Sequence, residues 1–103
     1  MTPSFCPVRW LAIAADHPAL TGHFPGQPIV PGVVLLDCLV ALLEETTPEQ
    51  RLAGIPVAKF MSPVAPDTLV LLGLDYEAVD RVRFLCRTTA GIAARGSFAL
   101  SNR

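Results

Sequence analysis

Residues 32–45, GVVLLDCLVALLEE, decide the fold. Their length, with leucine and alanine prevailing, predicts a helix of about four turns. The segment is apolar on every face until Glu44 and Glu45, so we expect other parts of the chain to wrap around it. The Thr-Thr-Pro sequence that follows should end the helix.

The rest of the chain reads as strands and connections. Residues 8–15 predict a short, mostly buried strand, whereas 16–31 contain four prolines and two glycines and cannot form regular structure. So long a connection in a small chain is more often functional than idle. Four strand-like runs follow the helix, at 51–64, 68–78, 82–90 and 92–101. The order predicts an α+β fold over residues 1–103, a single domain in which an antiparallel β-sheet wraps around one long central helix.

Composition narrows the class of protein. About half of the 103 residues are hydrophobic and 17% are charged, which excludes intrinsic disorder. No apolar run reaches the roughly 18 residues that a membrane-spanning helix requires. The N-terminal residues do not form a convincing signal peptide, so the expected compartment is the cytoplasm.

The cysteines and histidines do not predict a metal site. Cys6, Cys38 and Cys86 are widely spaced, no CxxC pair exists, and neither histidine lies at ligand spacing from a cysteine. We expect reduced, mostly buried thiols, and neither a metal nor another cofactor.

Charge is distributed unevenly along the chain. Residues 1–80 hold three basic and nine acidic side chains, whereas residues 81–103 hold five arginines and no acid. This asymmetry is compatible with an anionic partner and also with arginines that are simply solvated on a strand face, and alone it favours the second. A nucleic acid is a poor candidate because no known reader motif is present.

The segment 22–37, GHFPGQPIVPGVVLLD, holds the candidate chemistry. Asp37 is the only carboxylate in an aliphatic stretch, where desolvation would favour the protonated form that suits a general acid. Alternatively, its carboxylate caps a nearby loop. His23 stands among glycines and a proline that fix the backbone, so its ring could be aimed as a base, although a lone histidine is often structural. His17 lacks this context and is interpreted as a turn residue.

Pro31 and Gly32 open the predicted helix. They place unpaired N–H groups at its N-terminus, and Gly32 leaves room for a ligand atom to approach them. Such a terminus favours a developing negative oxygen. A base, an oxyanion site and an acid suit removal of a proton α to a carbonyl together with loss of a β-hydroxyl as water.

The pattern GHFPGxPxxPGxxxxD resembles the signature of the 3-hydroxyacyl-[acyl-carrier-protein] dehydratases of fatty acid synthesis, which have the hotdog fold. The later stretch AKFMSPVAPDTL, residues 58–69, is similar to a second family segment with its glycine missing. The resemblance therefore implies a hotdog fold, with the sheet around the helix, and dehydration of (3R)-3-hydroxyacyl thioesters in fatty acid or polyene-type biosynthesis.

The resemblance also implies roles for residues. His23 would take the C2 proton, Asp37 would activate or protonate the departing hydroxyl, and the amides of Gly32 and Val33 would polarise the thioester carbonyl. The substrate loop would comprise Phe24, Pro25, Gly26 and Pro31.

The expected partners follow from the same resemblance. Family active sites form between two subunits, so we expect a homodimer or a higher homo-oligomer. The acyl carrier protein that holds the 3-hydroxyacyl chain is acidic, which makes it a candidate partner for Arg81, Arg83 and Arg87. Ala41 stands where many members carry glutamine, and the chain is short. It therefore looks closer to small accessory dehydratases, such as those of aryl polyene pigment pathways, than to the housekeeping enzyme.

Two other functions stay open. Hotdog thioesterases use an acid on the same helix to direct water at the thioester carbon, although hydrolysis needs no C2 base such as His23. A non-catalytic hotdog subunit that completes the active site of a partner is also compatible with so short a chain.

Overall fold

The computed structural model describes residues 8–14 and 29–102. The elements are β1 (Val8–Leu11), α1 (Gly32–Thr46), β2 (Gln50–Phe60), β3 (Val70–Ala78), β4 (Arg81–Thr88) and β5 (Gly91–Asn102). The predicted helix and the four strands after it are thus confirmed. The second strand ends at Phe60, earlier than the sequence predicts, and residues 61–69, with prolines at 63 and 66, form no strand.

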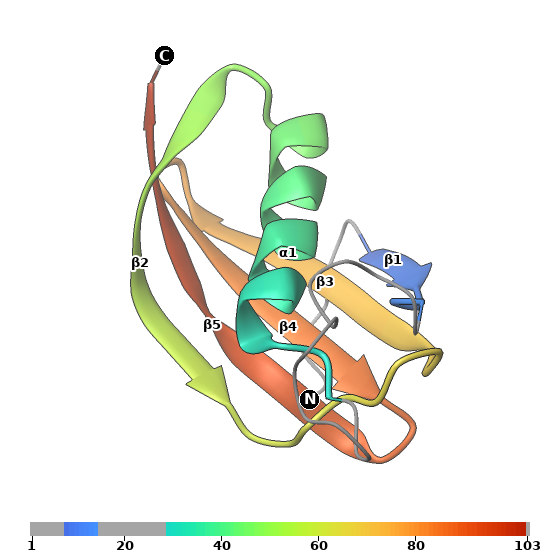
Figure 1. Cartoon of the computed structure of the whole chain (residues 1–103). Helices are drawn as coiled ribbons and strands as arrows, with labels where there is room; N and C mark the ends of the chain where they lie inside the picture. Colours follow the sequence, from blue (N-terminus) through green and yellow to red (C-terminus); the bar gives the residue numbers. More distant parts are fainter. Residues whose placement is uncertain (1–7, 15–28, 103) are drawn as a thin grey trace.

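The strands form one antiparallel sheet in the order β1-β3-β4-β5-β2. The sheet curves around α1, which lies across one of its faces (Figure 1). A single helix held in a curved antiparallel sheet is the hotdog fold that the sequence resemblance implies. Because β2 is an edge strand, its outer side is left without a neighbour among the described strands.

The core lies between α1 and the inner face of the sheet. On β4, buried Val82, Phe84 and Cys86 alternate with exposed arginines, as a strand with one covered face requires. The rings of Phe84 and Phe98 stack with their centroids 4.7 Å apart. Other fully or nearly fully buried side chains are Leu35, Leu39, Leu42, Val70, Leu72, Leu74 and Ala94. The expectation of a buried thiol holds for Cys86, whereas Cys38 is half-buried and Cys6 lies outside the described residues.

The expectation that α1 is covered on every side is wrong for the single chain. Val33, Asp37 and Ala41 recur at intervals of four residues and are exposed, Val33 to 62%. The sheet covers one side of the helix, formed by Leu35, Leu39 and neighbouring leucines. A helix that is apolar almost all round therefore keeps Val33 and Ala41 facing outward on either side of Asp37.

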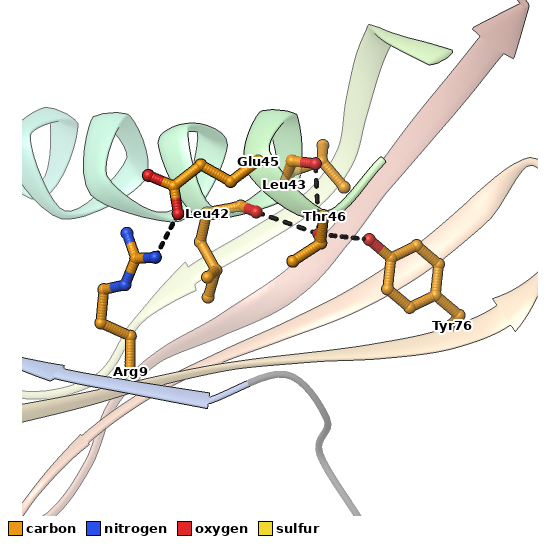
Figure 2. Close-up of polar contacts among 6 residues, drawn as sticks. All are labelled: Arg9, Leu42, Leu43, Glu45, Thr46 and Tyr76. Atoms are coloured by element: carbon orange, nitrogen blue, oxygen red, sulfur yellow. Dashed lines mark hydrogen bonds and ion pairs between the residues drawn. The ribbon is translucent and has the colours of Figure 1, made fainter. Parts of the chain in front are cut away.

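Polar contacts anchor the C-terminal end of α1 to the sheet (Figure 2). The Thr46 hydroxyl donates to the carbonyl oxygen of Leu42 at 3.0 Å and is hydrogen-bonded to the Tyr76 hydroxyl of β3 at 2.8 Å. The last turn also carries Glu45, which forms an ion pair with Arg9 of β1. These contacts fix the helix across β1 and β3.

The turn before β3 contains Asp67. In the family that the sequence resembles, a glycine precedes this aspartate, whereas here Asp67 directly follows Pro66. Asp67 has a φ of 61°, a left-handed conformation that aspartate adopts more readily than most residues. Its amide donates to the carbonyl oxygen of Ile13 at 2.8 Å. The missing glycine thus does not break the turn.

Candidate active site

The start of α1 is formed as the sequence predicts. Pro31 is the N-cap residue, with an extended backbone (φ −60°, ψ 145°), and the helix begins at Gly32. No side chain caps the helix, and no acidic residue lies in its first turn. The amides of Gly32 and Val33 therefore belong to a helix start whose donors have no side-chain acceptor, as an oxyanion site requires.

A hollow of about 520 Å³ surrounds this helix start. Two segments line it, residues 29–33 with Leu35 on one side and residues 60–64 on the other. The amide of Val30 donates to the carbonyl oxygen of Val64 at 2.7 Å, which ties the two segments together. Most of the lining is apolar, so a ligand here would approach the first amides of α1 from an environment that strengthens hydrogen bonds to charge.

Phe60, the last residue of β2, lies against the helix start. Its ring is so close to Gly32 that a β-carbon on residue 32 would lie 2.7 Å from Cε1 of the ring. The Phe60 side chain is 51% exposed, and that of the next residue, Met61, is 53% exposed. Phe60 was not predicted as a site residue from the sequence, although it belongs to the family-like stretch 58–69 and could have been found there.

Asp37 lies further along α1 and is exposed, on the same stripe as Val33. The expectation of an acid desolvated by its own chain is therefore wrong, because the sheet covers the opposite side of the helix. The neighbouring Cys38 is half-buried, and burial, together with the charge of Asp37, raises the pKa of its thiol. In the single chain, no part of the described structure covers the Asp37 carboxylate.

The predicted base lies outside the described residues. His23 and the loop residues Phe24, Pro25 and Gly26 all fall within 15–28, as does His17. The structure brings together Pro31, Gly32 and Val33 of the predicted site, with Asp37 on the same helix. The role of His23 stays a prediction.

The three arginines predicted to meet a carrier protein all lie on β4: Arg81, Arg83 and Arg87. They are separated by two and then four residues, so they share one face of the strand. All three are exposed and lie on the face of the sheet turned away from α1. Arg83 forms ion pairs with Asp75 and, at 3.1 Å, with Glu77. These carboxylates raise the pKa of the Arg83 guanidinium, so its charge is already partly balanced within the chain.

The described residues offer neither a metal centre nor a membrane span. Within residues 8–14 and 29–102, no group of histidine, cysteine or acidic side chains could hold a metal ion. In the same part of the chain, no helix has the length and apolar character needed to cross a membrane.

Comparison with protein families gives one match over most of the chain. A family model described as ApeI dehydratase matches residues 8–97. Among curated relatives, the 3-hydroxyacyl-[acyl-carrier-protein] dehydratase FabZ of Mannheimia succiniciproducens is 44% identical over 71 residues, covering 56% of this chain and 47% of the relative. FabZ of Haemophilus influenzae (strain Rd) is 32% identical over 96 residues, covering 84% of this chain and 64% of the relative. The chain thus spans about half to two thirds of the length of these relatives.

Two solved structures are similar to this one. An uncharacterized protein from Erwinia carotovora subsp. atroseptica has a TM-score of 0.81 at 25% identity, with 92% of this chain and 82% of that chain covered. The dehydratase heterocomplex ApeI:P from Xenorhabdus doucetiae has a TM-score of 0.82 at 24% identity, with both chains fully covered. At that identity, the second likeness shows the fold alone.

Proposed function

This chain belongs to the ApeI-like dehydratase family, and from that membership we propose that it removes water from a (3R)-3-hydroxyacyl thioester to give the trans-2-enoyl thioester. The match over residues 8–97 carries the proposal. The helix start supports it, because Gly32 and Val33 line an apolar hollow. The same helix also carries an acid, Asp37.

The proposed reaction uses three groups. His23 accepts the proton from C2 of the thioester, and the electron pair of that bond forms the C2–C3 double bond. The hydroxyl leaves C3 with a proton from Asp37, as water. The amides of Gly32 and Val33 hold the thioester carbonyl oxygen while negative charge develops on it. No cofactor takes part in this scheme.

The active site is proposed to need a second subunit. Asp37 is exposed in the single chain, on an outward-facing stripe with Val33 and Ala41. A second subunit over this stripe would exclude water from Asp37 and supply His23 from its own loop. We propose a homodimer or a higher homo-oligomer as the simplest assembly.

A partner of different sequence is the second assembly to test. The similar structure from Xenorhabdus doucetiae is a dehydratase heterocomplex. This likeness is the reason to test a partner of different sequence. In that case this chain would be a subunit that completes the site of a partner. It would show no dehydration alone and full activity only when mixed with that partner.

The proposed substrate is carried by an acyl carrier protein, in fatty acid or polyene-type biosynthesis. The FabZ relatives act, by name, on 3-hydroxyacyl-[acyl-carrier-protein]. Exposed Arg81 and Arg87 fit an acidic carrier of this kind. We also propose that residues 1–103 form one domain that works in the cytoplasm.

One assay separates dehydration from hydrolysis. The purified chain is incubated with a 3-hydroxyacyl thioester of N-acetylcysteamine, and the enoyl absorbance and free thiol are followed in one sample. We expect the absorbance to rise without release of thiol. Thiol release without enoyl product would instead identify a thioesterase. If neither signal appears until a second hotdog subunit is added, the chain is a subunit that completes a partner's site.

A further inference from the structure

The face of the sheet turned away from α1 carries a second hollow, of about 640 Å³. Its position follows from the strand alternation. Cys86 and Ala94 are buried against the helix, so the flanking Arg87 and Arg95 point to the opposite face. This hollow is therefore separated by the sheet from the one at the start of α1.

Strand register places two like charges side by side on this face. Lys59 of β2 is directly opposite Arg95 of β5, and Arg95 is opposite Leu85 of β4. Like charges that face each other across strands destabilise a sheet. Among the described residues no carboxylate forms an ion pair with Lys59 or Arg95. An anionic partner would relieve the repulsion between them.

A second row on the same face combines cationic and apolar side chains. Trp10 of β1 is opposite Leu71, Leu71 is opposite Arg87, and Arg87 is opposite Ile92. Trp10 is 58% exposed and Ile92 is 38% exposed. Exposed tryptophan and arginine beside aliphatic side chains are typical of protein–protein interfaces, in contrast to sites for small ions.

Arg83 lines the hollow together with its ion-pair partner Glu77, so one carboxylate lies within the hollow itself. The ion pairs of Arg83 with Asp75 and Glu77 leave two carboxylates beside it on β3. Four other cations line the hollow and form no ion pair with a carboxylate of the described residues: Lys59, Arg81, Arg87 and Arg95. Of these four residues, Arg81 and Arg87 were predicted from the sequence to meet a carrier protein.

We propose that this face, formed by Lys59, Arg87, Arg95, Leu71, Ile92 and Trp10, docks an acidic helix of a partner protein with apolar residues among its carboxylates. The proposal rests on the proposed function, in which the acidic partner is the acyl carrier protein. The cations of the face attract the carboxylates, and the apolar side chains of the second row pack against the partner's helix.

The chain's single tryptophan reports on this face. A holo acyl carrier protein without tryptophan is added to the intact chain, and tryptophan emission is followed at low and at high salt. We expect a saturable change that weakens as salt is raised. The double variant Arg87→Glu/Arg95→Glu should bind about tenfold more weakly or worse, because attraction becomes repulsion.

A single charge reversal outside the hollow, compared with Arg87→Glu alone, controls for net charge. Arg51→Glu changes an exposed arginine of β2 that hydrogen-bonds Ser101 and does not line the hollow. It should bind the carrier as wild type does. Equal weakening by Arg51→Glu, or wild-type binding by the double variant, would overturn the proposal. An emission change that depends on the concentration of this chain alone, and not on the carrier, would also overturn it and would assign the face to contact between copies.

The two proposals fail separately. Dehydration of the N-acetylcysteamine thioester by the wild-type chain tests the proposed reaction without a carrier protein, whereas tryptophan emission tests docking without turnover. Turnover of the small thioester with no carrier-dependent emission change would remove the docking face and leave the reaction in place.

Discussion

A β-carbon on Gly32 would lie 2.7 Å from Cε1, 2.9 Å from Cζ and 3.0 Å from Cδ1 of Phe60. The start of α1 and the end of β2 touch because residue 32 has no side chain. The ring of Phe60 thus lines the same hollow as Gly32 and Val33 at the start of the helix.

Gly32→Ala should therefore lower activity while preserving the fold. The added methyl group has to displace the Phe60 ring, which is half-exposed and has room to turn outward. We expect kcat/KM on a small thioester to fall about 100-fold, since small misplacements at a reacting centre are costly, and the free energy of unfolding to change by about 1 kcal/mol or less.

The double variant Gly32→Ala/Phe60→Ala tests the cause of that loss. Removing the ring removes the collision, so Phe60→Ala should cost less activity when Gly32→Ala is already present than it does in wild type. Additive losses in this cycle, measured as kcat/KM, would show that contact with Phe60 is not why position 32 is a glycine.

Gly96→Ala should destabilise the fold. A β-carbon there would lie 2.0 Å from the backbone oxygen of Val57 and 2.6 Å from Cζ of Phe84, and a backbone oxygen in a strand pair cannot turn away. We expect a loss of about 3 kcal/mol in the free energy of unfolding, measured by urea denaturation. Gly54→Ala on the paired strand is the control, because nothing lies within 4 Å of the added atom, and its loss should be much smaller.

Stability should fall at alkaline pH because of Cys86. Burial raises the pKa of its thiol from 9.0 to about 11. The folded chain therefore keeps this proton in a pH range where the unfolded chain releases it. The stabilisation is fully present below pH 9 and is lost as pH rises toward 11, by about 1.4 kcal/mol for each pH unit in that window.

The measurement is urea denaturation between pH 8 and pH 11 for wild type and Cys86→Ala. The variant starts less stable, because a buried side chain is truncated, and its stability should decline less steeply over this range. Parallel curves would show that titration of Cys86 does not contribute.

Asp37→Asn should separate catalysis from stability. Asp37 is exposed in the single chain, and its replacement by a side chain of the same shape should change the free energy of unfolding by about 0.5 kcal/mol or less. Turnover should fall by about 100-fold or more, since asparagine cannot give a proton to the departing hydroxyl. Near-normal turnover of Asp37→Asn would remove the acid from the mechanism.

The fold could be predicted from the sequence because its strongest signals are local. The apolar length of residues 32–45 and the alternation of Val82, Phe84 and Cys86 with arginines each specify their element without knowledge of the rest of the chain. The end of β2 at Phe60 was predicted too late, because the apolar residues up to Val64 continue the strand-like composition.

The site was less accessible to sequence reasoning. Apolar neighbours in sequence suggested that Asp37 is buried, but they extend around a helix of which the sheet covers only one side. Contacts between distant segments were also invisible. The approach of Phe60 to Gly32 and the pairing of Lys59 with Arg95 depend on strand register and on where α1 crosses the sheet.

The central claim, that His23 of one subunit and Asp37 of another act on the same thioester, is tested most directly by mixing two inactive variants. Each variant alone, His23→Ala or Asp37→Asn, is expected to lose most of its activity. When the two are unfolded together and refolded as a mixture, the account expects heterodimers in which one of the two sites has both groups intact. The account predicts that enoyl formation returns to about a quarter of the wild-type rate, as random pairing of the subunits gives. No recovery, in a mixture shown to contain heterodimers, would contradict it.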